Sequence, residues 1–205
     1  MKTSQIQRSL GLLIVALTTI LPSETPFADS RRHFELRYFG LSAPARAGWK
    51  ITSERTESIW FMRLPSDREF TMIGALRVDK IDRNLWAVPD EELARIFIDD
   101  YRQSAIQGGH GFSNEQFHSL EIGGKTFFAA SARITTIHKL PVDSDYDADE
   151  MVYVYIAKRK PGDQPNIYLF LYSDFRKKPA PSESNLSDFM SVLESFYPRE
   201  TLPAV

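Results

Sequence analysis

Several things are missing from this sequence, and each absence narrows what the protein can be. The chain has 205 residues and no cysteine, which excludes disulfide frameworks, a lipid-attachment cysteine and a cysteine nucleophile. Its formal net charge is −2, so no strong field of one sign attracts nucleic acid or an anionic membrane. There is no internal repeat and no low-complexity linker. The expected organisation is one ordinary globular domain.

Long hydrophobic runs are missing too, and the notable short one stands near the start of the chain. Leu10–Leu21 carries no charge, follows the basic residues Lys2 and Arg8, and ends at Pro22. It is shorter than the roughly 20 apolar residues that cross a bilayer, but it suits a signal-peptide core. We therefore expect residues 1–28 to be a signal peptide, with an uncleaved membrane anchor or a buried N-terminal helix as alternatives. The protein would then be periplasmic or secreted, and would meet the membrane only through that segment.

Residues 29–205 have the pattern of a single α/β domain. Runs rich in aromatic and β-branched residues, bounded by Pro, Gly, Ser or Asp, predict strands. Two of them, 151–157 and 167–173, do not alternate apolar with polar residues, so both of their faces should be covered. Tight turns between strands favour antiparallel pairing, and the predicted fold is α/β (α+β), a three-layer α/β/α sandwich around a mainly antiparallel sheet. The other predicted strands are 34–41, 49–55, 59–64, 70–78, 117–121 and 126–137.

Two helices are predicted. The first, residues 89–106, begins at a proline, has three acidic residues in its first turn and ends before Gly108-Gly109. The second, residues 183–197, has an apolar face that includes Phe189. The opposite faces are expected to face water; they carry Arg95, Asp99, Arg102 and, on the second helix, Asp188.

Four local features follow one another in a characteristic order. Ala47-Gly48-Trp49 opens an early strand, residues 89–92 (Pro-Asp-Glu-Glu) begin the middle helix, and residues 120–132 form a hairpin with a Gly pair at its turn. A last helix ends Ser195-Phe196-Tyr197. This order resembles the PsbP-like family of α/β/α sandwich domains over about residues 34–198. The resemblance implies a noncatalytic accessory domain of a bacterial envelope or thylakoid lumen, but a fold by itself assigns no chemistry.

An acidic string at residues 143–150 reads Asp-Ser-Asp-Tyr-Asp-Ala-Asp-Glu. Alternating carboxylates in a loop can converge on calcium, which takes roughly six to eight oxygen ligands. Asp143, Asp145 and Asp147 are the candidate metal ligands. The match to a helix-loop-helix calcium loop is poor, because Ala148 stands where the sharp turn needs glycine. The alternative is a solvated acidic hairpin loop without a cofactor.

No catalytic or cofactor-binding residue is assigned, because no reactive motif is present. The Gly-x-Ser-x-Gly turn of serine hydrolases is missing. His33, His110, His118 and His138 show no zinc-ligand spacing. His110 lies in a Gly-rich stretch after a helix, which suits a helix-ending loop and not a phosphate cradle. His138 stands near the acidic string and is a candidate to join it.

Function is therefore predicted at a coarse level. The leading hypothesis is an exported, noncatalytic accessory or binding domain of the cell envelope, whose partner is an envelope protein or a small ligand and not a nucleic acid. The alternative is an envelope hydrolase or transferase with a site dispersed in sequence. A flat aromatic patch would favour binding, and a deep pocket with convergent His, Asp or Ser would favour the enzyme. The candidates for an exposed patch are Trp60, Phe61, Tyr153 and Tyr155.

Overall fold

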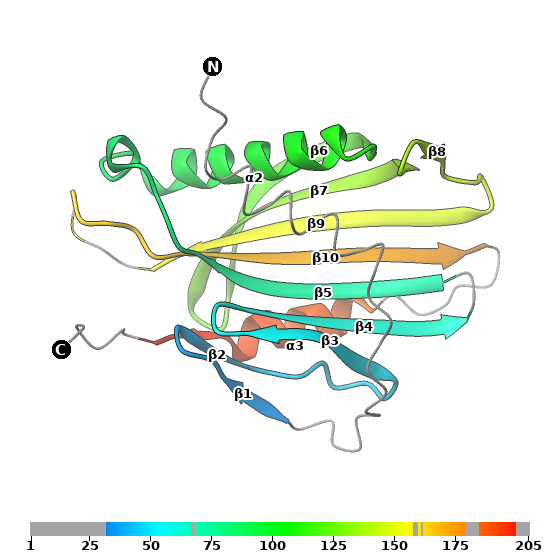
Figure 1. Cartoon of the computed structure of the whole chain (residues 1–205), viewed down its shortest axis with the longest axis horizontal. Helices are drawn as coiled ribbons and strands as arrows, with labels where there is room; N and C mark the ends of the chain where they lie inside the picture. Colours follow the sequence, from blue (N-terminus) through cyan, green and yellow to red (C-terminus); the bar gives the residue numbers. More distant parts are fainter. Residues whose placement is uncertain (1–31, 67–68, 158–159, 161, 179–184, 200–205) are drawn as a thin grey trace.

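The computed structural model describes residues 32–66, 69–157, 160, 162–178 and 185–199. The predicted signal peptide, residues 1–28, lies outside these ranges. No helix within them combines the length and the apolar character that crossing a bilayer requires. The elements labelled in Figure 1 are β1 (His33–Glu35), β2 (Phe39–Ser42), β3 (Trp49–Arg55), β4 (Ser58–Ser66), β5 (Glu69–Val78), α2 (Asp90–Gln107), β6 (Gly111–Ile122), β7 (Lys125–Ile137), β8 (Leu140–Pro141), β9 (Tyr146–Ile156), β10 (Ile167–Lys177) and α3 (Leu186–Ser195). A 3-10 turn, η2 (Arg83–Leu85), precedes α2, and a short strand, β11 (Tyr197–Pro198), follows α3.

The strands form two sheets, and every described pairing is antiparallel. The large sheet runs in the order β3-β4-β5-β10-β9-β7-β6, with β8 added to β7 (Figure 1). The small sheet has the order β1-β2-β11. The prediction of a mainly antiparallel sheet is confirmed.

Strand β10 shows why the sheet needs cover on both faces. Phe170 and Tyr172 belong to one core cluster together with Phe189 of α3. Leu169 and Leu171, which alternate with them along the strand, belong to a second cluster that includes residues of α2. All four strand side chains are at most 1% exposed. The two helices therefore cover opposite faces of the sheet, and the predicted three-layer sandwich is confirmed.

The predicted strand 34–41 is two strands. The backbone N–H of Leu36 donates to the carbonyl oxygen of Phe39 at 2.9 Å, which closes a turn between β1 and β2. Strand β11 then pairs with β2, and the ring of Tyr197 lies so close to Gly40 that a Cβ there would meet the ring at 2.4 Å. The sequence did not reveal the break, because no glycine or proline marks the turn at Leu36, Arg37 and Tyr38.

Helix α2 has the predicted position, and Gly109 adopts the left-handed φ of +96° that suits a helix end. Helix α3 spans Leu186–Ser195, which is shorter than the predicted 183–197, of which 183 and 184 lie outside the described residues. Arg102 and Asp188 were expected to face water, and both expectations are wrong: the two residues are 3% and 4% exposed. Each has buried partners that the helix periodicity alone does not show.

The candidate aromatic patch is not exposed. Phe61 is fully buried and Tyr153 is 5% exposed, and Tyr155 packs partly buried against the same core. Trp60 is partly buried and its ring lies against β5, where a Cβ at Gly74 would meet it at 2.3 Å. These aromatic side chains therefore fill the two cores, and the hypothesis of a flat aromatic binding surface at these residues is wrong.

Candidate functional site

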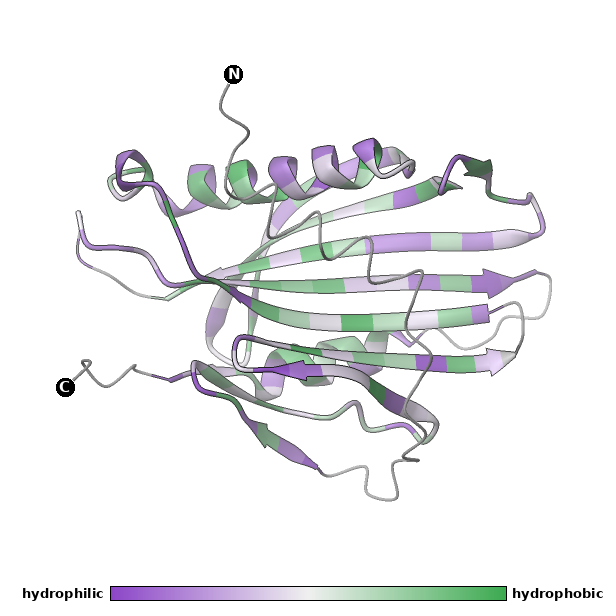
Figure 2. Cartoon of the chain, in the orientation of Figure 1, coloured by the Kyte–Doolittle hydropathy of each residue, from purple (hydrophilic) through white to green (hydrophobic). Residues whose placement is uncertain are grey.

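One end of the large sheet is polar on the face that α3 covers. A cross-strand row runs from Arg63 to Thr71, Asp174, Asp149 and Arg133, each paired with the next. Paired residues of neighbouring strands point to the same face of a sheet, so these five side chains stand in one line. Figure 2 shows the hydrophilic colouring of β9 and β10 at this end of the sheet. The sheet thus carries a polar margin beside an apolar core.

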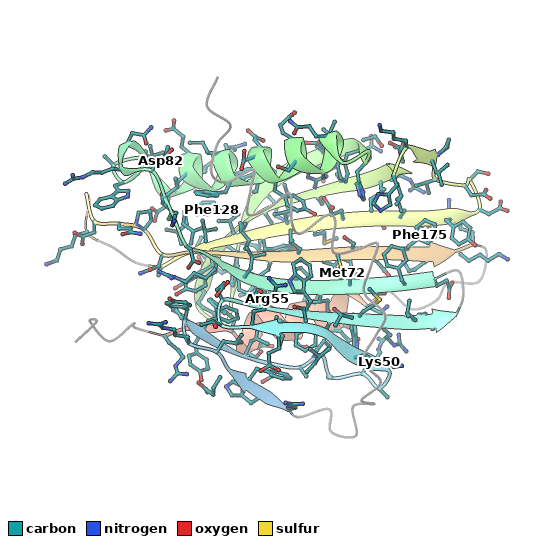
Figure 3. The ribbon with its side chains drawn as sticks, viewed as in Figure 1. Lys50, Arg55, Met72, Asp82, Phe128 and Phe175 are labelled. Atoms are coloured by element: carbon teal, nitrogen blue, oxygen red, sulfur yellow. The ribbon has the colours of Figure 1, made fainter. Side chains whose placement is uncertain are left out.

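A pocket of about 190 Å³ opens beside this row. It lies between β4, β5, β10 and the residue that precedes α3, and we call it the arginine pocket. Phe175 of its wall is labelled in Figure 3, near the end of β10. The pocket is lined by Arg46, Arg63, Pro65, Glu69, Thr71, Phe175, Arg176 and Asn185.

The floor of the arginine pocket is held by Asp174, which is 1% exposed. The hydroxyl of Thr71 donates to its Oδ1 at 2.7 Å, and the hydroxyl of Tyr172 donates to its Oδ2 at 2.8 Å. Nε of Arg176 lies 2.8 Å from the same Oδ2. A carboxylate offers only acceptors, so these groups fix the orientation of Thr71 and Arg176 around it.

Asn185 connects this floor to Arg63. Its Nδ2 donates to Oγ1 of Thr71 at 2.5 Å, and its Oδ1 accepts from Nη1 of Arg63 at 2.7 Å. Asn185 is also the N-cap residue of α3, yet its side chain makes no capping hydrogen bond. Nε of Arg63 donates to the backbone carbonyl of Ala47 at 3.2 Å. The guanidinium is therefore held in place by two neutral acceptors.

The other two arginines of the pocket already have carboxylate partners. Arg176 contacts Asp174 and also donates from Nη2 to Oδ2 of Asp149 at 3.0 Å. Nε of Arg46 lies 3.9 Å from Oδ2 of the buried Asp188. Within the described part of the chain, Arg63 makes no ion pair with a carboxylate, although it lines the same pocket. The pocket can therefore accept an anionic group at Arg63.

The acidic string is a loop only over residues 143–145, so the alternative of a solvated hairpin loop is wrong for the rest of it. Strand β9 begins at Tyr146, and from there to Glu150 the string is paired with β10. Burial alternates along it: Tyr146, Ala148 and Glu150 are buried, while Asp147 and Asp149 are partly exposed. The aspartates of the string recur at every second residue. We interpreted this spacing as a set of metal ligands, but it is the alternation of side chains along a strand.

The carboxylates of two candidate calcium ligands, Asp143 and Asp147, have protein partners. Nη2 of Arg133 donates to Oδ1 of Asp147 at 2.8 Å, and Nζ of Lys178 lies 3.2 Å from the same oxygen. The hydrogen bond from Arg133 lowers the pKa of Asp147. Oδ1 of Asp143 accepts from the backbone N–H of Asp145 at 3.0 Å. Among the described residues, no three His, Cys, Asp or Glu side chains gather as a metal site would require, and calcium binding stays a prediction.

The histidines lie apart from the arginine pocket. The ring of His138 is 4.9 Å from that of His110, centre to centre, so it joins His110 and not the acidic string. Burial lowers the pKa of His110. His33 contacts Glu35 at 2.9 Å and the hydroxyl of Tyr197 at 3.1 Å on the exposed side of the small sheet.

A buried ion pair between α2 and β9 was not predicted from the sequence. Nη1 of Arg102 lies 3.2 Å from Oε1 of Glu150, and the hydroxyl of Tyr101 donates to Oε2 of Glu150 at 2.9 Å. Burial raises the pKa of Glu150, and Arg102 opposes that rise. The guanidinium of Arg102 also lies 4.4 Å from the ring centre of Phe112. This pair is closed within the core between α2 and β9 and offers no site to a ligand.

None of the residues that line the arginine pocket was a candidate site residue in the sequence. They come from β4, β5, β10 and the two loops that precede β3 and α3. Arg63 and Asn185 are 122 residues apart, and Thr71 and Asn185 are 114 apart. Only the alternation of the acidic string, read as a strand, would have pointed to this end of the sheet.

No protein-family model matches the chain, and the curated proteins include no match. Solved structures with a similar course of the chain include a protein of Bacteroides thetaiotaomicron, with 10% identity and a TM-score of 0.46. That alignment covers 84% of this chain and 50% of the other, so this chain spans about half of that protein's length.

Two further similar structures are of comparable length to this chain. LpqN of Mycobacterium tuberculosis, described as involved in cell envelope biogenesis, has 9% identity and a TM-score of 0.45, over 86% of this chain and 90% of LpqN. The PsbP protein of Synechocystis sp. PCC 6803 has 14% identity and a TM-score of 0.44, over 87% of this chain and 99% of PsbP. The family that the order of elements resembles is thus represented among these structures. At such scores the likeness concerns the general course of the chain and carries no argument about function.

Proposed function

We propose that this chain is an exported, noncatalytic accessory domain that binds a small acidic ligand in the arginine pocket. The observation that carries the proposal is Arg63, whose guanidinium lines a pocket and is held only by neutral acceptors of the described residues. A fixed guanidinium is well suited to recognise an anionic oxygen group. Arg46 and Arg176 line the same pocket, and each of them already has a carboxylate partner.

Support for binding comes from the fixed geometry of the pocket. Thr71, Asn185 and Arg63 are joined in one chain of hydrogen bonds that ends on the buried Asp174. Side chains that are already oriented lose little conformational entropy when a ligand arrives. The accessory role in the envelope rests on the resemblance of the sequence, and export rests on residues 1–28.

The export half of the proposal is tested with a reporter enzyme that is active only outside the cytoplasm. Fused after Val205, it should be active with the full chain and inactive when residues 1–28 are deleted. The basic start and the short apolar core are the physical reason, because they match a signal peptide. A full-length fusion that is produced but shows no reporter activity would overturn this half.

The binding half is tested by thermal denaturation with succinate and inorganic phosphate at constant ionic strength. A ligand that binds only the folded state raises the melting temperature, so at least one of the two anions should do so. Glycerol, which is uncharged, should not. The rise should disappear in Arg63→Leu. If neither anion stabilises the wild-type protein, the pocket is not an anion site.

A further inference from the structure

Arginine side chains from three separate elements line the arginine pocket. Arg46 reaches it from the loop before β3, Arg63 from β4 and Arg176 from β10. A planar carboxylate is satisfied by one guanidinium in a bidentate pair. A tetrahedral oxyanion has oxygens in several directions, and it is the group that guanidinium groups from several sides can share.

Some guanidinium nitrogens of Arg63 and Arg176 already contact protein atoms, and the other nitrogens are those that a ligand can contact. In Arg63, Nη1 and Nε are used by Asn185 and Ala47, and Nη2 has no partner among the described residues. In Arg176, Nη2 and Nε face Asp149 and Asp174, and Nη1 is likewise unpartnered within the described ranges. These nitrogens belong to different strands, so together they suit an anion with more than two oxygens.

The rest of the lining suits a ligand with an organic part. Pro65 and Phe175 provide apolar wall beside the arginines. The lining also contains the acidic residue Glu69. Its Oε1 accepts a hydrogen bond from the backbone N–H of Lys177 at 3.0 Å. A bare inorganic anion would leave the apolar wall without a contact, whereas a phosphate ester of a small organic molecule would cover it.

We infer that the arginine pocket binds a phosphate monoester, with the phosphate at Arg63 and Arg176 and the organic group against Pro65 and Phe175. This inference rests on the proposed binding function and specifies the class of its ligand. The phosphate group is shared by soluble esters, free phosphate and the headgroup of phosphatidic acid, and the measurement separates these three sources.

The test is calorimetric titration of the full folded protein with glycerol 3-phosphate, inorganic phosphate and succinate, and co-sedimentation with phosphatidic acid vesicles. We expect glycerol 3-phosphate to bind more tightly than inorganic phosphate and succinate. Because the second proton of a phosphate ester leaves near pH 6, its affinity should rise between pH 5 and pH 7.5, while the affinity for sulfate should not. Tighter binding to vesicles than to glycerol 3-phosphate would assign the ester to a lipid headgroup.

The matched variants are Arg63→Leu, Arg63→Lys and Arg55→Leu. Arg55 is exposed at the opposite end of β3, so its variant makes the same charge change away from the pocket. Losing a charge-assisted contact should weaken glycerol 3-phosphate binding about tenfold or more in Arg63→Leu, and less in Arg63→Lys, which keeps the charge. Arg55→Leu should bind like the wild type.

Two results would overturn the inference, and only one of them would also refute the proposed acidic-ligand site. Succinate binding as tightly as glycerol 3-phosphate, with loss in Arg63→Leu, would refute the phosphate class and keep the acidic-ligand site. Absence of binding by every anion would refute both. Circular dichroism of each variant shows whether it is folded, and Arg63→Lys supplies the comparison if Arg63→Leu is not.

Discussion

Replacing Asp188 with alanine should destabilise the protein strongly, although Asp188 is a charged residue near the start of a helix. Its Oδ2 accepts from the indole N–H of Trp49 at 3.0 Å, and its Oδ1 accepts from the backbone N–H of Arg46 at 3.2 Å. Asp188 is 4% exposed and Trp49 is 2% exposed. The substitution therefore leaves two donors without their acceptor at a site that water reaches poorly.

The size of the loss follows from those two donors. A buried donor that loses its partner costs about 1–3 kcal/mol. The cost for the indole N–H of Trp49 should be near the upper end of this range, because the indole is buried. The cost for the backbone N–H of Arg46 should be near the lower end, because its hydrogen bond is only partly buried. We expect a total of about 3–4 kcal/mol. With a slope of about 2–3 kcal/mol per molar urea, the midpoint of unfolding should fall by about 1–2 M.

The control is Glu194→Ala, which removes a carboxylate from the exposed side of the same helix. Its unfolding free energy should change by no more than about 0.5 kcal/mol. Urea unfolding followed by far-ultraviolet circular dichroism measures both variants. As a second check, Trp49→Phe should cost less in the Asp188→Ala background than in the wild type, because the donor has already lost its acceptor. Equal midpoints for the two carboxylate variants would refute the reasoning.

The remaining predictions concern the two cores, one histidine and the acidic string. Phe189→Ala should cost about 3–5 kcal/mol in urea unfolding, because the ring is fully buried and leaves a cavity; a loss under about 1 kcal/mol would mean that α3 is loosely attached. Arg102→Met should cost about 3–5 kcal/mol because Glu150 stays buried without its cation, and adding Glu150→Leu should restore most of the stability. Burial lowers the pKa of His110 from its usual 6.5, so below about pH 6.5 the unfolded chain binds a proton that the folded protein excludes. Stability should therefore fall as the pH drops through this range, and His110→Gln should flatten that slope in a series of melting curves. Calcium should leave the melting temperature unchanged; a rise of several degrees that disappears when the three candidate aspartates of the acidic string become asparagine would establish the metal site.

The sequence by itself determined the elements whose signals are local. Strand β3 has the predicted bounds, 49–55, because aromatic and β-branched residues lie between turn residues. The predicted bounds of helix α2 are correct to within one residue at each end. The signals that fix them, the acidic first turn, the apolar stripe and the terminal glycines, all lie within the helix or next to it. The turn between β6 and β7 is also correct, since Gly123 and Gly124 adopt φ values of +54° and +71° that glycine tolerates best.

Tertiary structure decided which polar residues are buried and which of them meet. We predicted that Asp188 and Arg102 face solvent, because a helical pattern shows only that they are charged. Asp188 is buried with Trp49, 139 residues away, and Arg102 is buried with Glu150, 48 residues away. Residues 146–150 of the acidic string form a strand because β10 pairs with them, which their own composition does not specify. The arginine pocket has the same origin: its residues are brought together by the register of β4, β5 and β10 and by the docking of α3. Such contacts depend on register and packing between distant segments, and no local pattern of residues encodes them.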